Sequence, residues 1–413
     1  MVVRRAPRIR LLAIGLVVAT IAMGHAALYA WTTPPWHLFD EEQHVDYTLS
    51  LRDRRLPEIS DDIHQGIVDD AVANDRWATF GLPRPSSTQV QDLGLEGRSY
   101  EVYQPPVYYV AGVVAILPAG HDAGHALAWM RALSVLLAGG VAALVVLVSW
   151  EAVGAPERPS WFVATGGVLV ALLPSFAQAG GRVSNDIAVA AALLATLAAA
   201  LAWTRAGTTK LALLTGACAA GACLTKSSGL VAVIIVVLAM IKMRRGAMVV
   251  ALPIAGTAAW AALTWTRYGV FEGSRAFIEY THLHPRPWKL LTQATRPSVL
   301  GTALLMESQR AGANAWTLTI AGLALPLATV GAWCGRRLMS ASALVLVAGG
   351  AGVTVLAFAE GLEVAVMSRL VLPAVAAIAA LVGAGASHRM WRAPAVALAL
   401  ASAGMASWYY AQL

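Results

Sequence analysis

A run of acidic and aromatic residues directly after the first long apolar stretch is the part of the chain best suited to chemistry. It reads Asp-Glu-Glu-Gln-His-Val-Asp-Tyr over residues 40–47. On a helix, Asp40, His44 and Tyr47 would share one face, because they are spaced by four and three residues. Glu41 would lie beside them. A carboxylate held at a membrane surface loses hydration, which raises its basicity and suits it to accept a proton from an alcohol. The same residues would also suit the N-terminal cap of a helix facing water, so both interpretations stay open.

The composition indicates that lipid surrounds most of the chain. Of its 413 residues, 58% are hydrophobic and 13% are charged, and the mean hydropathy is +0.63. A soluble domain of this length needs far more charge to cover its surface. The net charge of +7 arises largely from short Lys and Arg clusters between apolar runs, as membrane topology requires, which argues against nucleic-acid binding.

Apolar runs of about 20 residues predict an all-α polytopic membrane protein with about eleven transmembrane helices. The predicted spans are 10–31, 127–150, 161–178, 186–204, 210–226, 228–243, 247–266, 315–333, 339–358, 370–387 and 394–411. The chain then divides into an N-terminal tail with the first helix (1–31), a long first outer loop (32–126), helices two to seven (127–267), a second outer loop (268–314) and helices eight to eleven (315–413). Within the first loop, the apolar stretch 104–117 is too short to span and is predicted to form a short interfacial helix.

Basic residues predict the orientation of these spans. With the N-terminus in the cytoplasm, most cytoplasmic loops carry a basic cluster and the C-terminus lies outside the cell membrane. The clusters are Arg205 with Lys210, Lys242 with Arg244 and Arg245, Arg336 with Arg337, and Arg389 with Arg392.

Disulfide and zinc chemistry have no support in the sequence. The three cysteines lie in apolar runs, and none forms a Cys-x-x-Cys pair. The second outer loop holds a basic aromatic patch, made of His282, His284, Arg286, Trp288 and Lys289. Two histidines alone do not indicate a metal, so no metal ligand is assigned. The patch would contact either a phosphate or sugar group or an anionic lipid surface.

Several short motifs, in their order along the chain, resemble the C-type membrane glycosyltransferases. The likeness is greatest to the branch of protein O-mannosyltransferases and lipid A aminoarabinose transferases, and to actinobacterial relatives, and it extends to about residue 375. The motifs are Asp40-Glu41 followed by His44 and Tyr47, Gln104-Pro105-Pro106-Val107-Tyr108-Tyr109, Arg131-Ala132-Leu133-Ser134, Pro174 followed by Ser184-Asn185-Asp186, Thr225-Lys226, and Ser368-Arg369-Leu370-Val371-Leu372-Pro373.

This resemblance implies transfer of a sugar from a polyprenyl-phosphate carrier to a glycan, lipid or protein acceptor on the outer face. Asp40 would be the catalytic base, with Glu41 supporting it or binding the acceptor. Charge on the departing phosphate would be stabilised by cations, for which Arg131, Lys226 and Arg369 are the candidates. Further substrate contacts would come from His44, Tyr47, Gln104, Tyr108 and Asp186. The lipid-linked sugar would be the donor substrate, and a divalent metal, although compatible with the reaction, has no assigned ligands.

Each of these positions also has a structural interpretation. The cations would serve equally as interfacial anchors whose side chains reach toward the headgroups. Asp186 would serve equally as the N-terminal cap of a helix. The sequence departs from the family at Leu370, where many relatives carry an aromatic residue, and we expect no large soluble C-terminal domain.

Two other functions compete with this one. A transporter or lipid flippase would place ionisable residues near the bilayer midplane. Here the predicted span centres hold almost no charge, and the ionisable residues gather toward one membrane face. These are Asp186, Lys226, Glu360, Glu363 and Arg369. A catalytically inactive envelope scaffold is the third possibility, against which the retained Asp40-Glu41 pair argues.

Overall fold

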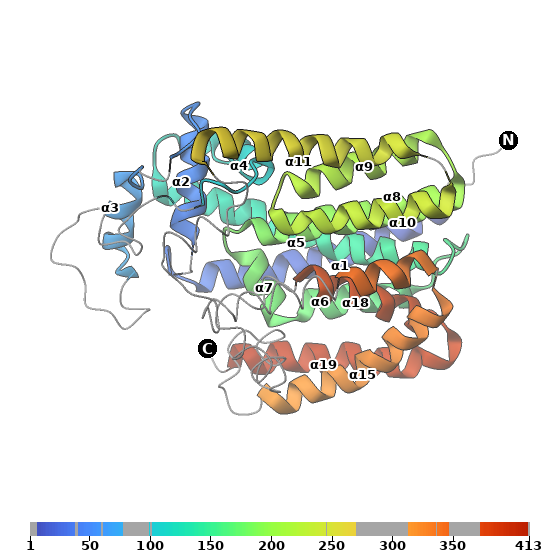
Figure 1. Ribbon diagram of the computed structural model, residues 1–413. Helices are drawn as coiled ribbons and strands as arrows, with labels where there is room; N and C mark the ends of the chain where they lie inside the picture. The colour runs from blue at the N-terminus through green and yellow to red at the C-terminus, as the bar shows by residue number, and fades with distance from the viewer. Residues whose placement is uncertain are drawn as a thin grey trace, which may run out of the picture.

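The computed structural model describes residues 6–37, 40–58, 61–76, 99, 101–244, 246–269, 313–335, 337–346 and 372–411, and its regular structure there is helical. Long helices run roughly parallel through the body of the protein, and short helices gather at one end (Figure 1). The long ones are α1 (Ala6–Thr32), α5 (Ala123–Ala152), α8 (Asn185–Ala206), α11 (Ala247–Tyr268) and α15 (Ala313–Cys334).

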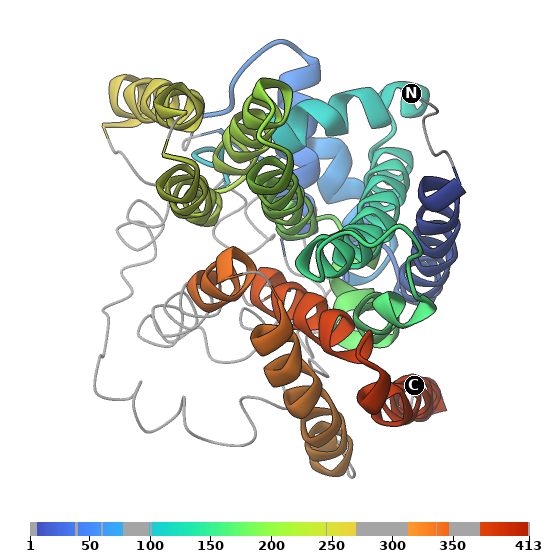
Figure 2. The same cartoon turned by 90° about the vertical axis from the view of Figure 1, so that its right-hand side faces the viewer.

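Shorter helices complete the bundle. They are α6 (Thr165–Leu172), α7 (Pro174–Gly181), α9 (Thr209–Cys223), α10 (Val231–Met243), α18 (Leu372–Ala386) and α19 (Arg392–Ala411). Figure 2 views the helices nearly end-on and shows the C-terminal ones at one side of the molecule. There α18 packs against α15 on one side and against α5 and α6 on the other, so it joins the C-terminal helices to the rest.

Close helix contacts depend on residues without a side chain. A Cβ atom added to Gly385 of α18 would overlap the carbonyl oxygen of Leu327 on α15, and one added to Gly331 of α15 would overlap that of Leu381 on α18. Such small-residue contacts let helix backbones approach closely, as in other membrane helix pairs, where dispersion and not hydrophobic exclusion drives association.

The prediction of eleven spans is wrong for the described part of the chain. Four helices there are long and apolar enough to cross a membrane, namely Ile9–Thr32, Ala123–Ala152, Asn185–Ala206 and Met248–Tyr268. The number rises to six if each of two bent helix pairs counts as one span. The structure therefore fits a helical membrane protein with fewer clear spans than the apolar runs indicate.

Local breaks in the helices account for the difference. Proline cannot continue a helix from the preceding turn, and Pro174 divides the predicted span 161–178 into two pieces that differ in direction by 67°. The predicted spans 210–226 and 228–243 give helices of 15 and 13 residues, separated by a turn around Lys226. Part of the predicted span 339–358 and the first two residues of 370–387 lie outside the described residues.

The segment 32–126 contains short helices, as predicted. They are α2 (Glu41–Arg52), α3 (Gln65–Ala73) and α4 (Val107–Ala115), and they pack against the start of α5 at one end of the bundle (Figure 1). A separate apolar cluster holds them together, with Trp36, Tyr47, Ile67, Tyr109 and Met130 fully buried at its centre. This end of the protein has its own core, which gives it a fixed shape.

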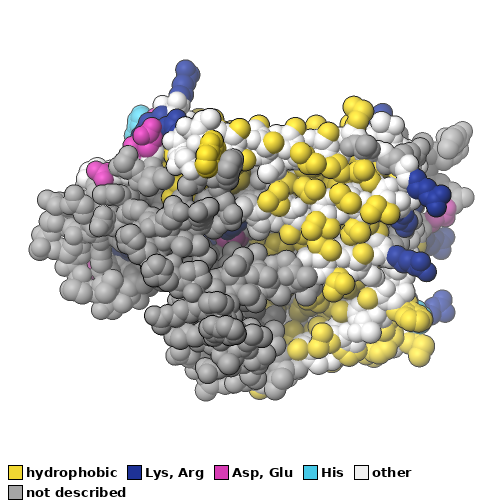
Figure 3. Space-filling model, in the orientation of Figure 1, with side chains coloured by type: hydrophobic (Ala, Val, Ile, Leu, Met, Phe, Trp, Pro, Cys, Tyr) yellow, Lys and Arg dark blue, Asp and Glu magenta, His cyan; other side chains and the backbone are white. Residues whose placement is uncertain are grey.

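Apolar side chains cover the middle of the visible surface, and Lys and Arg gather at the end opposite α2 (Figure 3). Leu12, Leu136 and Leu400 expose 73%, 63% and 69% of their surfaces. Burial in hydrocarbon is favourable for such side chains, so the apolar surface matches a lipid environment. Basic residues lie at the ends of α8 and α10, at the starts of α9 and α19, and in the 3-10 turn Arg389–Trp391 just before α19. They are Arg205, Lys210, Lys242, Arg389 and Arg392.

Candidate functional site

Helix α2 is polar in sequence yet buried along most of its length. Every residue from Glu41 to Ser50 is buried, although five of them are ionisable. Burial of a charge costs several kcal/mol unless a partner compensates it, so each ionisable side chain here is expected to have one. The partners come from segments far away in the sequence.

Glu41 forms a buried ion pair with Arg131 of α5. The Nε and Nη2 atoms of Arg131 donate to Oε1 and Oε2 of Glu41 at 2.9 and 2.6 Å, in the two-pronged geometry that suits a guanidinium and a carboxylate. Oε1 also accepts a hydrogen bond from the backbone N–H of Val183 at 3.0 Å. Glu41 has no exposed surface. Its carboxylate therefore joins α2 to α5 and to the turn that precedes α8.

The same guanidinium caps the end of α1. Arg131 donates to the carbonyl oxygens of Ala30, Thr33 and Pro34 at 3.2, 2.8 and 3.1 Å. The last carbonyls of a helix lack partners within the helix, so a cation is favourable at this position. With the two bonds to Glu41, this accounts for all three nitrogen atoms of Arg131. The structure thus gives Arg131 a structural contact in place of the open position that a phosphate ligand needs.

Glu42 is the second buried carboxyl of the motif. It pairs with Arg76, which lies beyond α3 and is itself buried. Burial raises the pKa of Glu42 to about 7, which Arg76 opposes. The nearby charges of Asp40 and Glu41 act in the same direction as burial. Protonation of Glu42 is therefore easier than that of an exposed carboxyl.

His44 and Tyr47 both contact Tyr109 of α4. The Nδ1 atom of His44 is 2.9 Å from the Tyr109 hydroxyl, and the rings of Tyr47 and Tyr109 are stacked with centroids 3.9 Å apart. The Tyr47 hydroxyl donates to the backbone carbonyl of Gln104 at 3.1 Å. Burial raises the pKa of Tyr109 well above its usual value, so this hydroxyl stays protonated. The three side chains connect α2 to α4.

Asp40 differs from its two acidic neighbours. It is half-buried, and it occupies the N-terminal cap of α2 with φ of 70°, in the left-handed region. Its backbone carbonyl accepts from the N–H groups of Gln43 and His44 at 3.1 Å, but its side chain makes no capping hydrogen bond. Aspartate tolerates this backbone conformation at a cost of about 1 kcal/mol. Such strain persists where surrounding contacts impose it, and functional sites are enriched in it.

A second polar cluster lies where α8 begins. The Lys226 ammonium donates to Asp186 Oδ1 at 2.6 Å and to Asn185 Oδ1 at 3.1 Å. Asn185 donates from Nδ2 to the side-chain oxygen of Gln104 at 3.3 Å. Arg182 approaches the same carboxylate, with Nη2 4.0 Å from Asp186 Oδ2. Asp186 therefore lies between two cations, and these three side chains together carry a net positive charge.

Tyr108 of α4 lies between the two clusters. Its hydroxyl is 3.3 Å from the Ser134 hydroxyl. Burial raises its pKa most, hydrogen bonds with Ser134 and Ser184 oppose this, and the charges of Glu41 and Asp186 add to it. The charges of the Glu41 and Asp186 carboxylates thus both act on one buried phenol. The clusters belong to one polar region at this end of the bundle.

The structure brings together most of the residues predicted for the site. Lys226 and Asp186 form a direct pair, Gln104 contacts Asn185, and Glu41 and Arg131 are joined. Arg369 and the patch around His282 lie outside the described residues. The expected N-terminal cap is Ser184 and not Asp186, because the Ser184 hydroxyl accepts from the backbone N–H of Asp186 at 3.1 Å in the first turn of α8.

Sequence reasoning missed four residues of this region, namely Glu42, Arg76, Tyr109 and Arg182. Arg182 carried a usable signal, since an arginine close to a predicted membrane span is costly unless it has a role. Among the described residues, no group of three His, Cys, Asp or Glu side chains is arranged to hold a metal ion. Comparison of the chain with protein-family models, curated proteins and solved structures finds no match.

Proposed function

We propose that the protein is a membrane-embedded glycosyltransferase that moves a sugar from a polyprenyl-phosphate carrier to an acceptor on the outer face of the cell membrane. The observation that carries this proposal is the difference between Asp40 and its neighbours. Glu41 and Glu42 are buried against Arg131 and Arg76, whereas Asp40 is half-buried in a strained backbone conformation. Asp40 is thus the carboxylate of the motif best placed to meet an acceptor.

In this reaction the acceptor hydroxyl would give its proton to Asp40 while its oxygen attacks the anomeric carbon of the sugar. The bond between that carbon and the phosphate oxygen would break, and the electron pair would leave with the phosphate. Lys226 and Arg182 supply positive charge near one carboxylate, which supports a role in stabilising the departing anion. Their position in the same polar region as Glu41 is consistent with one site.

The charge at one end of the bundle supports an orientation for this proposal. The end opposite α2 carries exposed basic residues, including Lys210 and Arg389, which is the pattern of a cytoplasmic face. Under this proposal the N-terminus is cytoplasmic, and the polar region opens to the outside. Cysteine labelling of intact cells tests it: R54C should react with an impermeant reagent from outside, and K210C should react only after permeabilisation. The reverse pattern contradicts the orientation.

Transfer by the purified protein tests the activity directly. Protein in nanodiscs is incubated with a panel of polyprenyl-phospho-sugars and alcohol acceptors, and sugar transfer is measured. D40N should lower the rate by about 100-fold or more, the usual contribution of a general base. D53N is the matched control, because Asp53 is an exposed carboxylate at the other end of α2. A D40N enzyme that keeps the rate of D53N would reject Asp40 as the base.

A transporter is the second candidate, and the bend between α6 and α7 favours it. Pro174 breaks this segment by 67°, and broken helices frame substrate sites in many transporters. The buried carbonyl oxygen Oε1 of Gln178, on α7, has no hydrogen-bond partner among the described residues. Uptake into proteoliposomes separates the two functions. Accumulation of unmodified sugar or lipid that D40N leaves intact would favour transport.

A further inference from the structure

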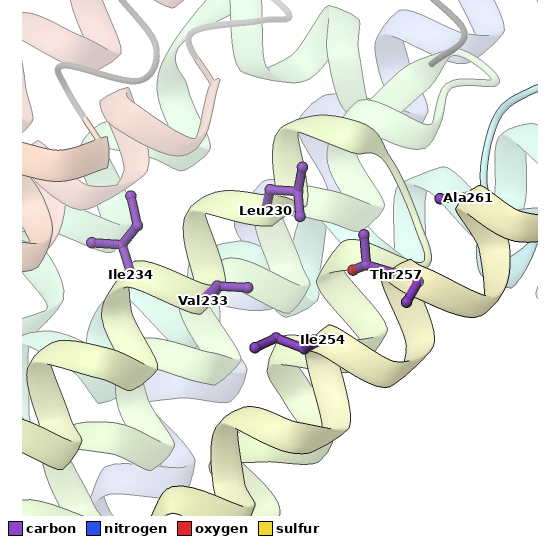
Figure 4. Close-up of a pocket in the computed structure, with 7 residues that line it drawn as sticks. Leu230, Val233, Ile234, Ile254, Thr257 and Ala261 are labelled. Carbon is purple, nitrogen blue, oxygen red and sulfur yellow. The ribbon is translucent and has the colours of Figure 1, made fainter. Parts of the chain in front are cut away.

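The backbone at Asp40 is held by contacts from outside α2. Its φ of 70° is unfavourable for aspartate, and its side chain makes no capping hydrogen bond to compensate. Such a conformation persists where the surrounding structure imposes it. The open groove between α10 and α11 provides no polar group for this, because its lining is apolar apart from Thr257, whose hydroxyl donates to the carbonyl oxygen of Pro253 (Figure 4). Besides those of Arg131, the contacts come from α3 and the residues just after it.

Before Asp40, two aromatic side chains contact α3. Trp36 is fully buried, and its Nε1 atom donates to Asp70 Oδ2 at 2.6 Å. The Nε2 atom of His37 lies 3.0 Å from the backbone carbonyl oxygen of Asn74, the C-terminal cap of α3. Trp36 itself has a positive φ, of 62°. The chain therefore enters the turn at Asp40 in a conformation that α3 constrains.

After Asp40, a charged side chain contacts the same part of the protein. Glu42 pairs with Arg76, shortly beyond the end of α3, and both are buried. Contacts on both sides of Asp40 thus converge on residues 70–76. This segment is in turn packed on α5, since a Cβ atom added to Gly124 would lie 3.0 Å from Asp70 Oδ2. The absence of a side chain at Gly124 leaves room for the Asp70 carboxylate.

We propose that Asp70 is a positioning residue for Asp40, which acts through Trp36 to hold the turn that leaves the Asp40 carboxylate half-buried. The importance of this position for sugar transfer rests on the proposed function. An amide oxygen accepts the Trp36 N–H as a carboxylate oxygen does, so the hydrogen bond and not the charge of Asp70 is required. D70N should therefore keep the position of Asp40, and D70A should lose it.

Chemical labelling reports the position of Asp40 without requiring transfer. Full-length protein in nanodiscs is treated with a water-soluble carbodiimide and an amine, and coupling at Asp40 is measured by mass spectrometry relative to coupling at the exposed Asp53. Release of the left-handed turn should expose the Asp40 carboxylate, so D70A should raise its relative labelling rate about fivefold or more. D70N should leave this rate unchanged. So should the control D69A, which removes the neighbouring exposed carboxyl of α3.

Two glycine variants move the Asp70 carboxylate without replacing it. In G124A the new methyl group meets Oδ2, so the carboxylate has to shift by a few tenths of an ångström and its hydrogen bond to Trp36 weakens. In G66A, on α3, the methyl group meets only the Cβ atom of Ala123 at 3.8 Å, which is an ordinary contact. G124A should therefore raise the labelling of Asp40, and G66A should not.

Kinetics of an active enzyme separate positioning from general damage to the fold. D70A should lower kcat by about 10- to 100-fold and leave the KM of the donor unchanged, because a misplaced base slows the chemical step. D70N, which keeps the hydrogen bond, should restore kcat. In a D40N background D70A should have no further effect, whereas damage to the fold would lower the residual rate as well.

The outcomes separate this inference from the proposed function. If D70A and G124A raise the labelling of Asp40 but the wild type transfers no sugar, the positioning role stands and the proposed activity fails. Unchanged labelling in D70A, equal labelling in D70A and D69A, or a change in D70N as large as that in D70A would overturn the role of Asp70, even where the wild type is active. A loss of rate in D70A that persists in full in the D40N background would overturn it too.

Discussion

The buried pair of Glu41 and Arg131 makes a strong prediction about stability. R131M removes the cation but leaves a buried carboxylate and three carbonyls, at the end of α1 and just after it, without their donor. Loss of one partner from a buried pair costs about 3–5 kcal/mol. The carbonyls lie at a helix end where water can replace the guanidinium, so their loss of a donor adds little to the free-energy cost of R131M. We expect R131M to lower the free energy of unfolding by about 4 kcal/mol.

A double-mutant cycle isolates the pair from the other contacts of Arg131. E41Q alone should be destabilising, because it leaves the Arg131 guanidinium buried without its counter-charge. E41Q with R131M removes both charges, so the double variant should be more stable than the sum of the single changes predicts, by about 2 kcal/mol or more. The free energy of unfolding is measured by reversible unfolding in mixed detergent micelles.

The control for this cycle is R158M, because Arg158 is exposed in the connection between α5 and α6. It should change the free energy of unfolding by less than about 0.5 kcal/mol. Additive effects of E41Q and R131M would refute the pair as a coupled unit. An R131M protein as stable as R158M would refute the whole account of α2 as a helix held by ion pairs.

Three further predictions concern protonation and helix packing. Burial raises the pKa of Glu42 to about 7 from a usual 4.5. The stability due to this group is therefore full below pH 4.5 and is lost as the pH rises to about 7. E42Q should make the free energy of unfolding less dependent on pH between pH 4.5 and 7. The hydrogen bond to Asp46 raises the pKa of His64 above 6.5, so its contribution is full below pH 6.5 and lost as the pH rises through the raised pKa; H64Q should remove that decline, and a decline that persists would contradict it. G385A should destabilise by about 1–3 kcal/mol in the same unfolding assay, because the new methyl group meets backbone of α15, whereas G322A, with open space around it, should not.

Hydropathy predicted the helical membrane fold but overcounted the spans, for a physical reason. An apolar run records which residues tolerate lipid, whereas the length of a helix depends on where its backbone breaks. Pro174 and the turn at Lys226 interrupt runs that are apolar on both sides. In the segment 32–126, α4 was predictable because its apolar stretch is too short to span and follows two prolines. The polar helix α2 was suggested only by the spacing of its acidic and aromatic residues, and α3 was not predicted.

The sequence pointed to some residues of the polar region, but it did not reveal how they pair. The motif pointed to Asp40, Glu41 and His44, and helical spacing placed them near each other. Their partners lie elsewhere in the sequence: Arg131 is 90 residues from Glu41, and Tyr109 is 65 residues from His44. Periodicity describes one helix at a time, so it cannot reveal which helix supplies a counter-charge. That Glu41 serves as a structural anchor while Asp40 is only half-buried emerges only from the packing.

Substitution of Asp40 separates the strain of this position from its chemistry. Glycine adopts φ of 70° without penalty, so D40G should stabilise the fold or leave it unchanged, since any gain of about 1 kcal/mol is offset by the greater freedom of the unfolded chain. Asparagine tolerates the same conformation, and D40N should match the wild type. Alanine does not, and D40A should be the least stable, by about 1 kcal/mol. If Asp40 is the base, all three variants lose sugar transfer to the same extent, whatever their stability. Activity that follows stability across the three would instead make Asp40 a residue that shapes the turn before α2, and the general base would have to be sought elsewhere.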